Sequence, residues 1–222
     1  MRFRTLNPDG AAGALLESVN DKAGNDKPVN STFGSAAYGG EHWSPRQASH
    51  AQENGHVWRT CGIDSEWRRL EAVLLHCPGE ELHVSLENPE AVQMLESVDL
   101  GRAREEHQAM VEAYRAQQVQ VHYVEPEQPC QPNLMFCADL FVMTPQGAIL
   151  ARPASTVRAG EERQVARRLA ELGIPLLKTL TGNAVFEGAD LMWIDANTAI
   201  VGRGLRTNDA AIAQLANLFA EL

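Results

Sequence analysis

The chain has 222 residues, of which 44% are hydrophobic and 22% charged, a composition typical of a soluble globular protein with a sizeable core. A net charge of −10 disfavours nucleic acid and anionic membranes as partners. No run approaches the roughly 18 apolar residues of a membrane helix, and because the first residues lack an apolar core of about 7–15 residues, we do not expect them to form a secretory signal. The four cysteines form no CxxC pair and show no zinc-ligand spacing with histidines, so we expect reduced thiols in a cytoplasmic protein without a metal.

Two regions are expected from the composition along the chain. Residues 1–56 are rich in Gly, Ser, Asn and Asp without a sustained period, which predicts a poorly ordered arm. Residues 57–222 are expected to fold. In this part, "LEAVLLHCP" (70–78) predicts a strand, residues 101–117 predict a helix whose inner face holds His107, Met110 and Tyr114, and "VQVHYVEP" (119–126) predicts a second strand.

An internal repeat is the most informative feature of the sequence. "ADLFVMTPQGAILARP" (138–153) aligns without a gap on "ADLMWIDANTAIVGRG" (189–204), and each copy indicates a strand, a tight turn and a strand. An amphipathic helix follows each copy, and after the first helix "IPLLKTL" (174–180) predicts a third strand, which gives a β-β-α-β unit. A period near 50 residues suggests a propeller or another array of units that bury their faces against neighbours. The second copy ends at Leu222, before its third strand, so we expect a fragment of a longer protein.

Charged residues recur at matched positions of the two copies. Asp139 and Asp190 are equivalent, which favours a shared structural role at the start of each hairpin. Glu187 aligns with Phe136, so the repeat itself does not require a carboxylate there; it is either a solvated turn residue or a ligand for a cation. Arg158 follows Asp139 by 19 residues, as Arg206 follows Glu187.

These two carboxylates and two arginines form a candidate site for a zwitterion, because carboxylates bind a guanidinium and arginines bind a carboxylate with paired hydrogen bonds. Each arginine alone is better explained as a solvated charge beside a helix, and it is the matched spacing of the two that favours a functional role. Cys137 lies two residues before Asp139, but no histidine is placed to activate it, so we interpret it as a buried strand residue.

"PNLMFCAD" (132–139), "FEGAD" (186–190) and "GRGLRTN" (202–208), in this order, resemble the arginine deiminase–amidinotransferase superfamily of guanidino-modifying enzymes. The resemblance runs from about residue 57 to residue 222. It implies the pentein fold, an α/β propeller of five β-β-α-β units, and here about the first half of that ring. It also implies that Asp139 and Glu187 bind the substrate guanidinium, and that Asn133, Arg158 and Arg206 hold a substrate carboxylate. Ala138 departs from the family, whose members often have arginine there.

The same resemblance implies covalent chemistry without a metal or organic cofactor. A cysteine attacks the guanidino carbon, a histidine protonates the departing amine, and the amidino-thioether then passes to water in a hydrolase or deiminase, or to an amine in an amidinotransferase. In the family, that histidine and cysteine follow the third motif; here 14 residues follow Asn208, without His or Cys. We therefore expect a chain that carries substrate-binding residues for arginine-like molecules, is inactive alone, and self-associates through its open ring edge. The alternatives are a non-catalytic pentein-like binding module and an inactive fragment.

Overall fold

The computed structural model describes residues 38–40, 43–126 and 130–222. Contacts divide the chain into one unit of residues 3–49 and another that contains residues 50–222. Helix α1 (His50–Glu53) therefore belongs to the larger unit, and a 3.0 Å hydrogen bond joins the His50 ring to the Gln146 carbonyl oxygen. The sequence-based boundary was placed at residue 56, and most of the predicted arm lies outside the described residues.

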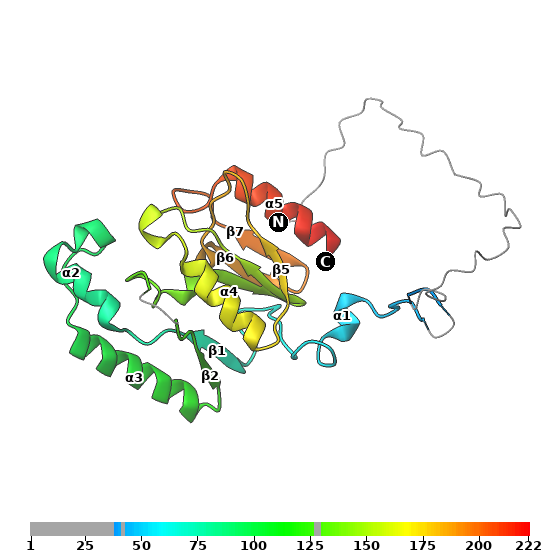
Figure 1. Cartoon of the computed structure of the whole chain (residues 1–222), viewed down its shortest axis with the longest axis horizontal. Coiled ribbons are helices and arrows are strands. Elements are labelled where there is room, and N and C mark those ends of the chain that lie inside the picture. Colours follow the sequence, from blue (N-terminus) through cyan, green and yellow to red (C-terminus); the bar gives the residue numbers. More distant parts are fainter. Residues whose placement is uncertain (1–37, 41–42, 127–129) are drawn as a thin grey trace, which may run out of the picture. The chain divides into compact units, whose positions relative to one another are not determined.

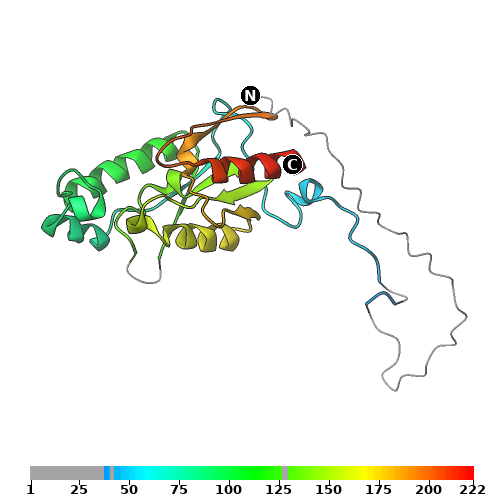
Figure 2. The same ribbon diagram turned by 90° about the horizontal axis from the view of Figure 1, so that it is seen from above.

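The larger unit begins with a parallel strand pair connected through a helix. Strand β1 (Ala72–Leu75) pairs with β2 (Gln120–Tyr123), and α3 (Leu100–Ala116) lies beside them (Figures 1 and 2). Three short elements precede α3, namely η1 (Glu80–His83), α2 (Val84–Glu87) and η2 (Glu90–Val92). The Asp99 side chain caps α3 by accepting from the Arg102 amide. Val111 of α3 is fully buried while Met110 is 40% exposed, so the predicted inner face was wrong by one position at this turn.

The first copy of the repeat folds as the sequence predicts. A short helical turn, η3 (Cys137–Asp139), leads into the antiparallel hairpin of β3 (Phe141–Thr144) and β4 (Gly147–Leu150). The chain then passes through η4 (Thr156–Arg158) and α4 (Glu161–Glu171) to β5 (Leu176–Thr179), which lies parallel to β4. The strand order β3-β4-β5 confirms the β-β-α-β unit.

The second copy has matching elements at the predicted offset. The turn η5 (Gly188–Asp190) leads into the hairpin of β6 (Leu191–Asp195) and β7 (Thr198–Val201), and α5 (Asp209–Glu221) follows. Asp139 and Asp190 each end their turn, as the alignment requires. Within the described residues the strands form three separate sheets of two, three and two strands, so the architecture is α/β without a closed sheet, and the predicted incomplete propeller ring stays a prediction. None of the described helices is long and apolar enough to cross a membrane.

Two apolar clusters hold these units together. Phe186 and Trp193 belong to one cluster, and a 2.8 Å hydrogen bond from the Trp193 indole to the Met143 carbonyl oxygen links the second hairpin to the first. The Trp193 and Phe219 rings pack edge to face, which fixes α5 on its hairpin. The other cluster lies between α4 and the first hairpin and contains Val124, Leu134, Cys137, Leu140, Ala148, Leu150, Val165 and Leu169.

Candidate functional site

The turns η3 and η5, which carry the acidic residues of both copies, lie against each other. At Gly188 a Cβ atom would stand 2.2 Å from the Phe141 carbonyl oxygen and 2.6 Å from that of Ala138. Only glycine permits this approach of two backbone segments, because any side chain would collide with main-chain atoms that have no freedom to move aside. The glycine of "FEGAD" therefore sets the distance between the two acidic turns.

Arg158 lies beneath η3, and each of its three guanidinium nitrogens has a hydrogen-bond partner. Its Nη1 is 2.6 Å from Asp139 Oδ2, and its Nε is 2.8 Å from Glu161 Oε2. Its Nη2 donates to the carbonyl oxygens of Phe136 at 3.2 Å and Asn133 at 3.4 Å. Since only 6% of Arg158 is exposed, its guanidinium holds Asp139 and the turn in place from inside the protein. In the first copy, the two residues at the matched spacing of 19, Asp139 and Arg158, form an ion pair inside the protein.

Glu161, at the start of α4, is the second carboxylate of this network and is fully buried. Burial raises its pKa to about 7, against the opposing effect of the Arg158 charge. Sequence reasoning missed Glu161. Its position three residues after Arg158, at a helix start, was the available signal, because such side chains lie on the same face of a helical turn.

Glu187, immediately before η5, is a buried carboxylate whose negative charge is only partly compensated. It is 5% exposed, and the nearest cationic atom of its ion pair, Arg206 Nη1, is 3.4 Å from Oε2. The Arg206 side chain is 64% exposed, so this pair is open to solvent on the arginine side. Burial raises the pKa of Glu187, the negative charge of Asp139 raises it further, and Arg206 opposes both. The site thus carries an anion that a second cation would stabilise.

Asp190 is anchored differently from its repeat equivalent. The Thr207 hydroxyl donates to Asp190 Oδ2 at 2.6 Å, and Thr207 is fully buried. The same hydroxyl oxygen accepts from the Glu187 backbone amide at 3.5 Å. A threonine therefore performs in the second copy the anchoring that Arg158 performs in the first. Sequence reasoning missed Thr207, although it stands in "GRGLRTN" next to Arg206.

Asn133 and Cys137, which the sequence also singled out, form hydrogen bonds inside the protein. The Asn133 side chain is buried and donates from Nδ2 to the Val92 carbonyl oxygen at 2.9 Å, which ties η2 to the site. Cys137 is buried as predicted, although in a helical turn rather than a strand, and donates to the Leu134 carbonyl oxygen. Burial raises the pKa of its thiol to about 12, which disfavours the reactive thiolate form.

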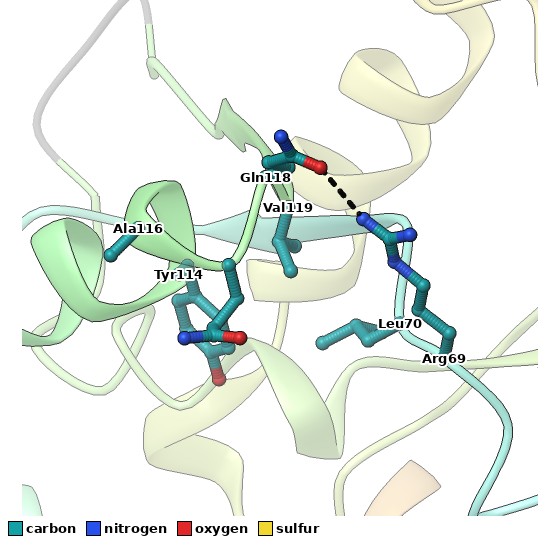
Figure 3. Close-up of a pocket in the computed structure, with 7 residues that line it drawn as sticks. Arg69, Leu70, Tyr114, Ala116, Gln118 and Val119 are labelled. Carbon is teal, nitrogen blue, oxygen red and sulfur yellow. Dashed lines mark hydrogen bonds between the residues drawn. The ribbon is translucent and has the colours of Figure 1, made fainter.

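The structure thus brings Asp139, Glu187, Arg158 and Arg206 into one electrostatic neighbourhood. Two cavities among the described residues lie elsewhere. One, of about 510 Å³, is lined by residues of the loop before β1 and the end of α3, where Arg69 donates to Gln118 (Figure 3). The other, of about 440 Å³, lies between the ends of β1 and β2. Neither includes a predicted site residue.

Comparison with known proteins decides the family. The family described as N,N dimethylarginine dimethylhydrolase, eukaryotic, matches residues 89–221, which is more than half of the chain. The chain belongs to this family. It is 34% identical over 127 residues to N(G),N(G)-dimethylarginine dimethylaminohydrolase of Streptomyces coelicolor, covering 57% of this chain and 48% of that protein. It is 27% identical over 159 residues to the uncharacterized protein YkgA of Bacillus subtilis, covering 71% and 54%.

Solved structures agree on the fold. The dimethylarginine dimethylaminohydrolase of Pseudomonas aeruginosa in complex with citrulline superposes with a TM-score of 0.59 at 20% identity, over 68% of this chain and 57% of that one. The N-terminal domain of the cyanobacterial arginine dihydrolase ArgZ, bound to substrate, gives 0.57 at 20% identity, over 67% and 55%. Membership of the superfamily inferred from the three motifs is confirmed. The chain spans about half the length of the curated relatives it matches.

Proposed function

We propose that this chain forms the guanidinium-binding part of a hydrolase that acts on arginine-like substrates, N-methylated arginines among them. The named relatives support water as the acceptor, so we prefer hydrolysis to amidino transfer; because they are dimethylarginine hydrolases, we also prefer that activity to arginine deimination, which uses water as well. We further propose that its repeats are part of a pentein ring. Family membership does not favour a non-catalytic binding module.

The observation that supports this most directly is the state of Glu187. A buried carboxylate whose pKa is raised by burial and by a second carboxylate is an unfavourable charge in the free protein. A guanidinium placed between Glu187 and Asp139 would offset both negative charges and donate hydrogen bonds to each carboxylate. In a reaction at the guanidino carbon, the same two carboxylates would stabilise the positive charge as the carbon becomes tetrahedral.

The two arginines then have different parts. Arg206 is exposed, and among the described residues Glu187, at 3.4 Å, is its one ion-pair partner, so a ligand guanidinium can replace it there and free it to bind the ligand carboxylate. Arg158 is enclosed by internal acceptors, which supports a positioning role for it beneath Asp139. The Asn133 amide is likewise used internally. Direct contacts of these two residues with the substrate carboxylate stay predictions from the resemblance.

We assign the nucleophilic step to none of the three cysteines whose pKa is perturbed. Burial raises the pKa of the Cys61 thiol, and it raises those of Cys130 and Cys137 to about 11 and about 12, which disfavours the thiolate that attacks carbon. The expectation that the catalytic histidine and cysteine are absent from this chain remains part of the proposal.

Calorimetric titration of the 222-residue chain with N,N-dimethylarginine tests the binding role. We expect Glu187→Gln, which keeps the shape and removes the charge, to weaken binding at least about tenfold, or about 1.4 kcal/mol. Glu171→Gln, on the exposed side of α4, is the matched control and should leave the affinity unchanged. No binding by the unchanged chain, or equal binding by the Glu187→Gln variant, would contradict the proposal.

We also propose self-association through the hairpin of β6 and β7. Met192 and Ile200 are cross-strand partners, and together with Ile194 they expose 54%, 52% and 41% of their surface. An apolar sheet face of this kind favours contact with another protein surface. Light scattering over a range of concentrations should show association that Met192→Lys reduces; a monomer at every concentration would refute this part.

A further inference from the structure

A group of three potential metal ligands lies outside the acidic site. Donor atoms of His76, Glu81 and Cys130 all lie within 4.8 Å of one another. They come from three segments: the end of β1, the turn η1, and the segment before η3. Sequence spacing could not reveal the group, because Cys130 is 54 residues from His76. The group shares no residue with the guanidinium site, so metal binding by it does not depend on the proposed function.

The hydrogen bonds around His76 orient its ring for a cation. Its Nδ1 lies 2.9 Å from the Val124 carbonyl oxygen, which can only accept, so Nδ1 carries the proton. In the neutral ring, Nε2 then presents a lone pair to Glu81 Oε1 at 3.1 Å. Two acceptors at this distance require a proton or a metal ion between them. An Nδ1–H bond to a backbone carbonyl is also the contact that usually fixes a metal-binding histidine.

The third ligand and the spacing fit a small tetrahedral ion. Cys130 Sγ lies 3.9 Å from His76 Nε2. Zinc bonds of about 2.0–2.1 Å to nitrogen and oxygen and about 2.3 Å to sulfur, at tetrahedral angles, place N and O about 3.3 Å apart and N and S about 3.6 Å apart. The observed 3.1 Å from His76 to Glu81 and 3.9 Å from His76 to Cys130 lie within a few tenths of an ångström of these values, and the distance from Glu81 to Cys130 is at most 4.8 Å.

We propose that His76, Glu81 and Cys130 bind one Zn²⁺ ion. Imidazole, carboxylate and thiolate are the ligand types that zinc takes, whereas Mg²⁺ and Ca²⁺ prefer oxygen alone. The Cys130 thiol, protonated in the metal-free chain, would lose its proton to solvent when the ion binds. Three protein ligands leave a fourth position for a water molecule. The ion would join η1 and the segment that leads into η3 to the end of β1.

Two measurements on the full chain test this site. Calorimetry with Zn²⁺ should give one ion per chain, and Co²⁺ should give a thiolate-to-cobalt charge-transfer band in the near ultraviolet. Cys130→Ser and Glu81→Gln should each weaken Zn²⁺ binding at least about tenfold, and Cys130→Ser should remove the band. Cys77→Ser is the matched control, because Cys77 is exposed and adjacent to His76, and it should change neither.

Far-ultraviolet circular dichroism without metal checks that each variant is folded, and Glu81→Gln provides a second test if Cys130→Ser unfolds. The proposal is overturned if the unchanged chain binds no Zn²⁺, which would leave His76 and Glu81 as a simple ion pair. It is also overturned if Cys130→Ser binds as tightly as the unchanged chain, or if Cys77→Ser weakens binding equally.

Discussion

Replacing Arg158 by methionine should destabilise the fold strongly, because the guanidinium compensates two carboxylates at once. Methionine fills a similar volume but removes contacts of 2.6 Å to Asp139 and 2.8 Å to Glu161. Glu161 is fully buried and cannot turn to solvent, so it must either keep an uncompensated charge or take up a proton. Removing one partner of a buried pair typically costs about 3–5 kcal/mol, and we expect a loss in this range.

Urea unfolding followed by circular dichroism measures this loss. The double variant Arg158→Met, Glu161→Gln should recover at least about 1 kcal/mol, because the uncompensated carboxylate is then gone. Arg163→Ala, an exposed arginine on α4, serves as the control and should change stability by no more than about 0.5 kcal/mol. A loss below about 1 kcal/mol for Arg158→Met would refute the view that this arginine holds the acidic turn.

Three further predictions concern the same neighbourhood. Folding raises the pKa of Glu161 from 4.5 to about 7, so the folded state binds more protons than the unfolded state between these pH values. The contribution of Glu161 to stability therefore falls as the pH rises through this range, by at most about 1.4 kcal/mol per pH unit. Urea unfolding at several pH values should show this pH dependence, and Glu161→Gln should remove it. Gly188→Ala should lower the free energy of unfolding by about 1–3 kcal/mol or more and abolish ligand binding, because the added Cβ would meet carbonyl oxygens of the η3 segment. Gly204→Ala is the control: Gly204 has open space around it, so this variant should melt at the same temperature as the unchanged chain. Thr207→Val should cost about 1–3 kcal/mol in urea unfolding by leaving Asp190 without its 2.6 Å donor.

The repeat made most of the C-terminal fold predictable. Because "ADLFVMTPQGAILARP" and "ADLMWIDANTAIVGRG" align without a gap, they fix two hairpins with two-residue turns and place Asp139 and Asp190 at equivalent points. Glu187 stands beside that alignment without a partner in the first copy, which left it either a solvated turn residue or a ligand for a cation. The structure shows that it is buried, and its role as a ligand stays a prediction.

Contacts between distant segments were not predictable in the same way. Equal spacing of Arg158 and Arg206 from their carboxylates suggested equal roles, yet one arginine is 6% exposed and the other has a side chain that is 64% exposed. Burial depends on how α4 and η3 pack, which a local pattern does not encode. Met110 was misplaced for a similar reason, since neighbouring positions of a helix face differ by packing alone.

The titration of the Glu187 carboxyl group, followed by ¹³C NMR with and without a guanidino ligand, tests the central claim most directly. Burial and the nearby Asp139 should raise its pKa above the ordinary value in the free chain, and a bound guanidinium should lower it by stabilising the charged form. An unchanged Glu187 titration in the presence of saturating N,N-dimethylarginine would contradict the assignment of this residue as the guanidinium ligand.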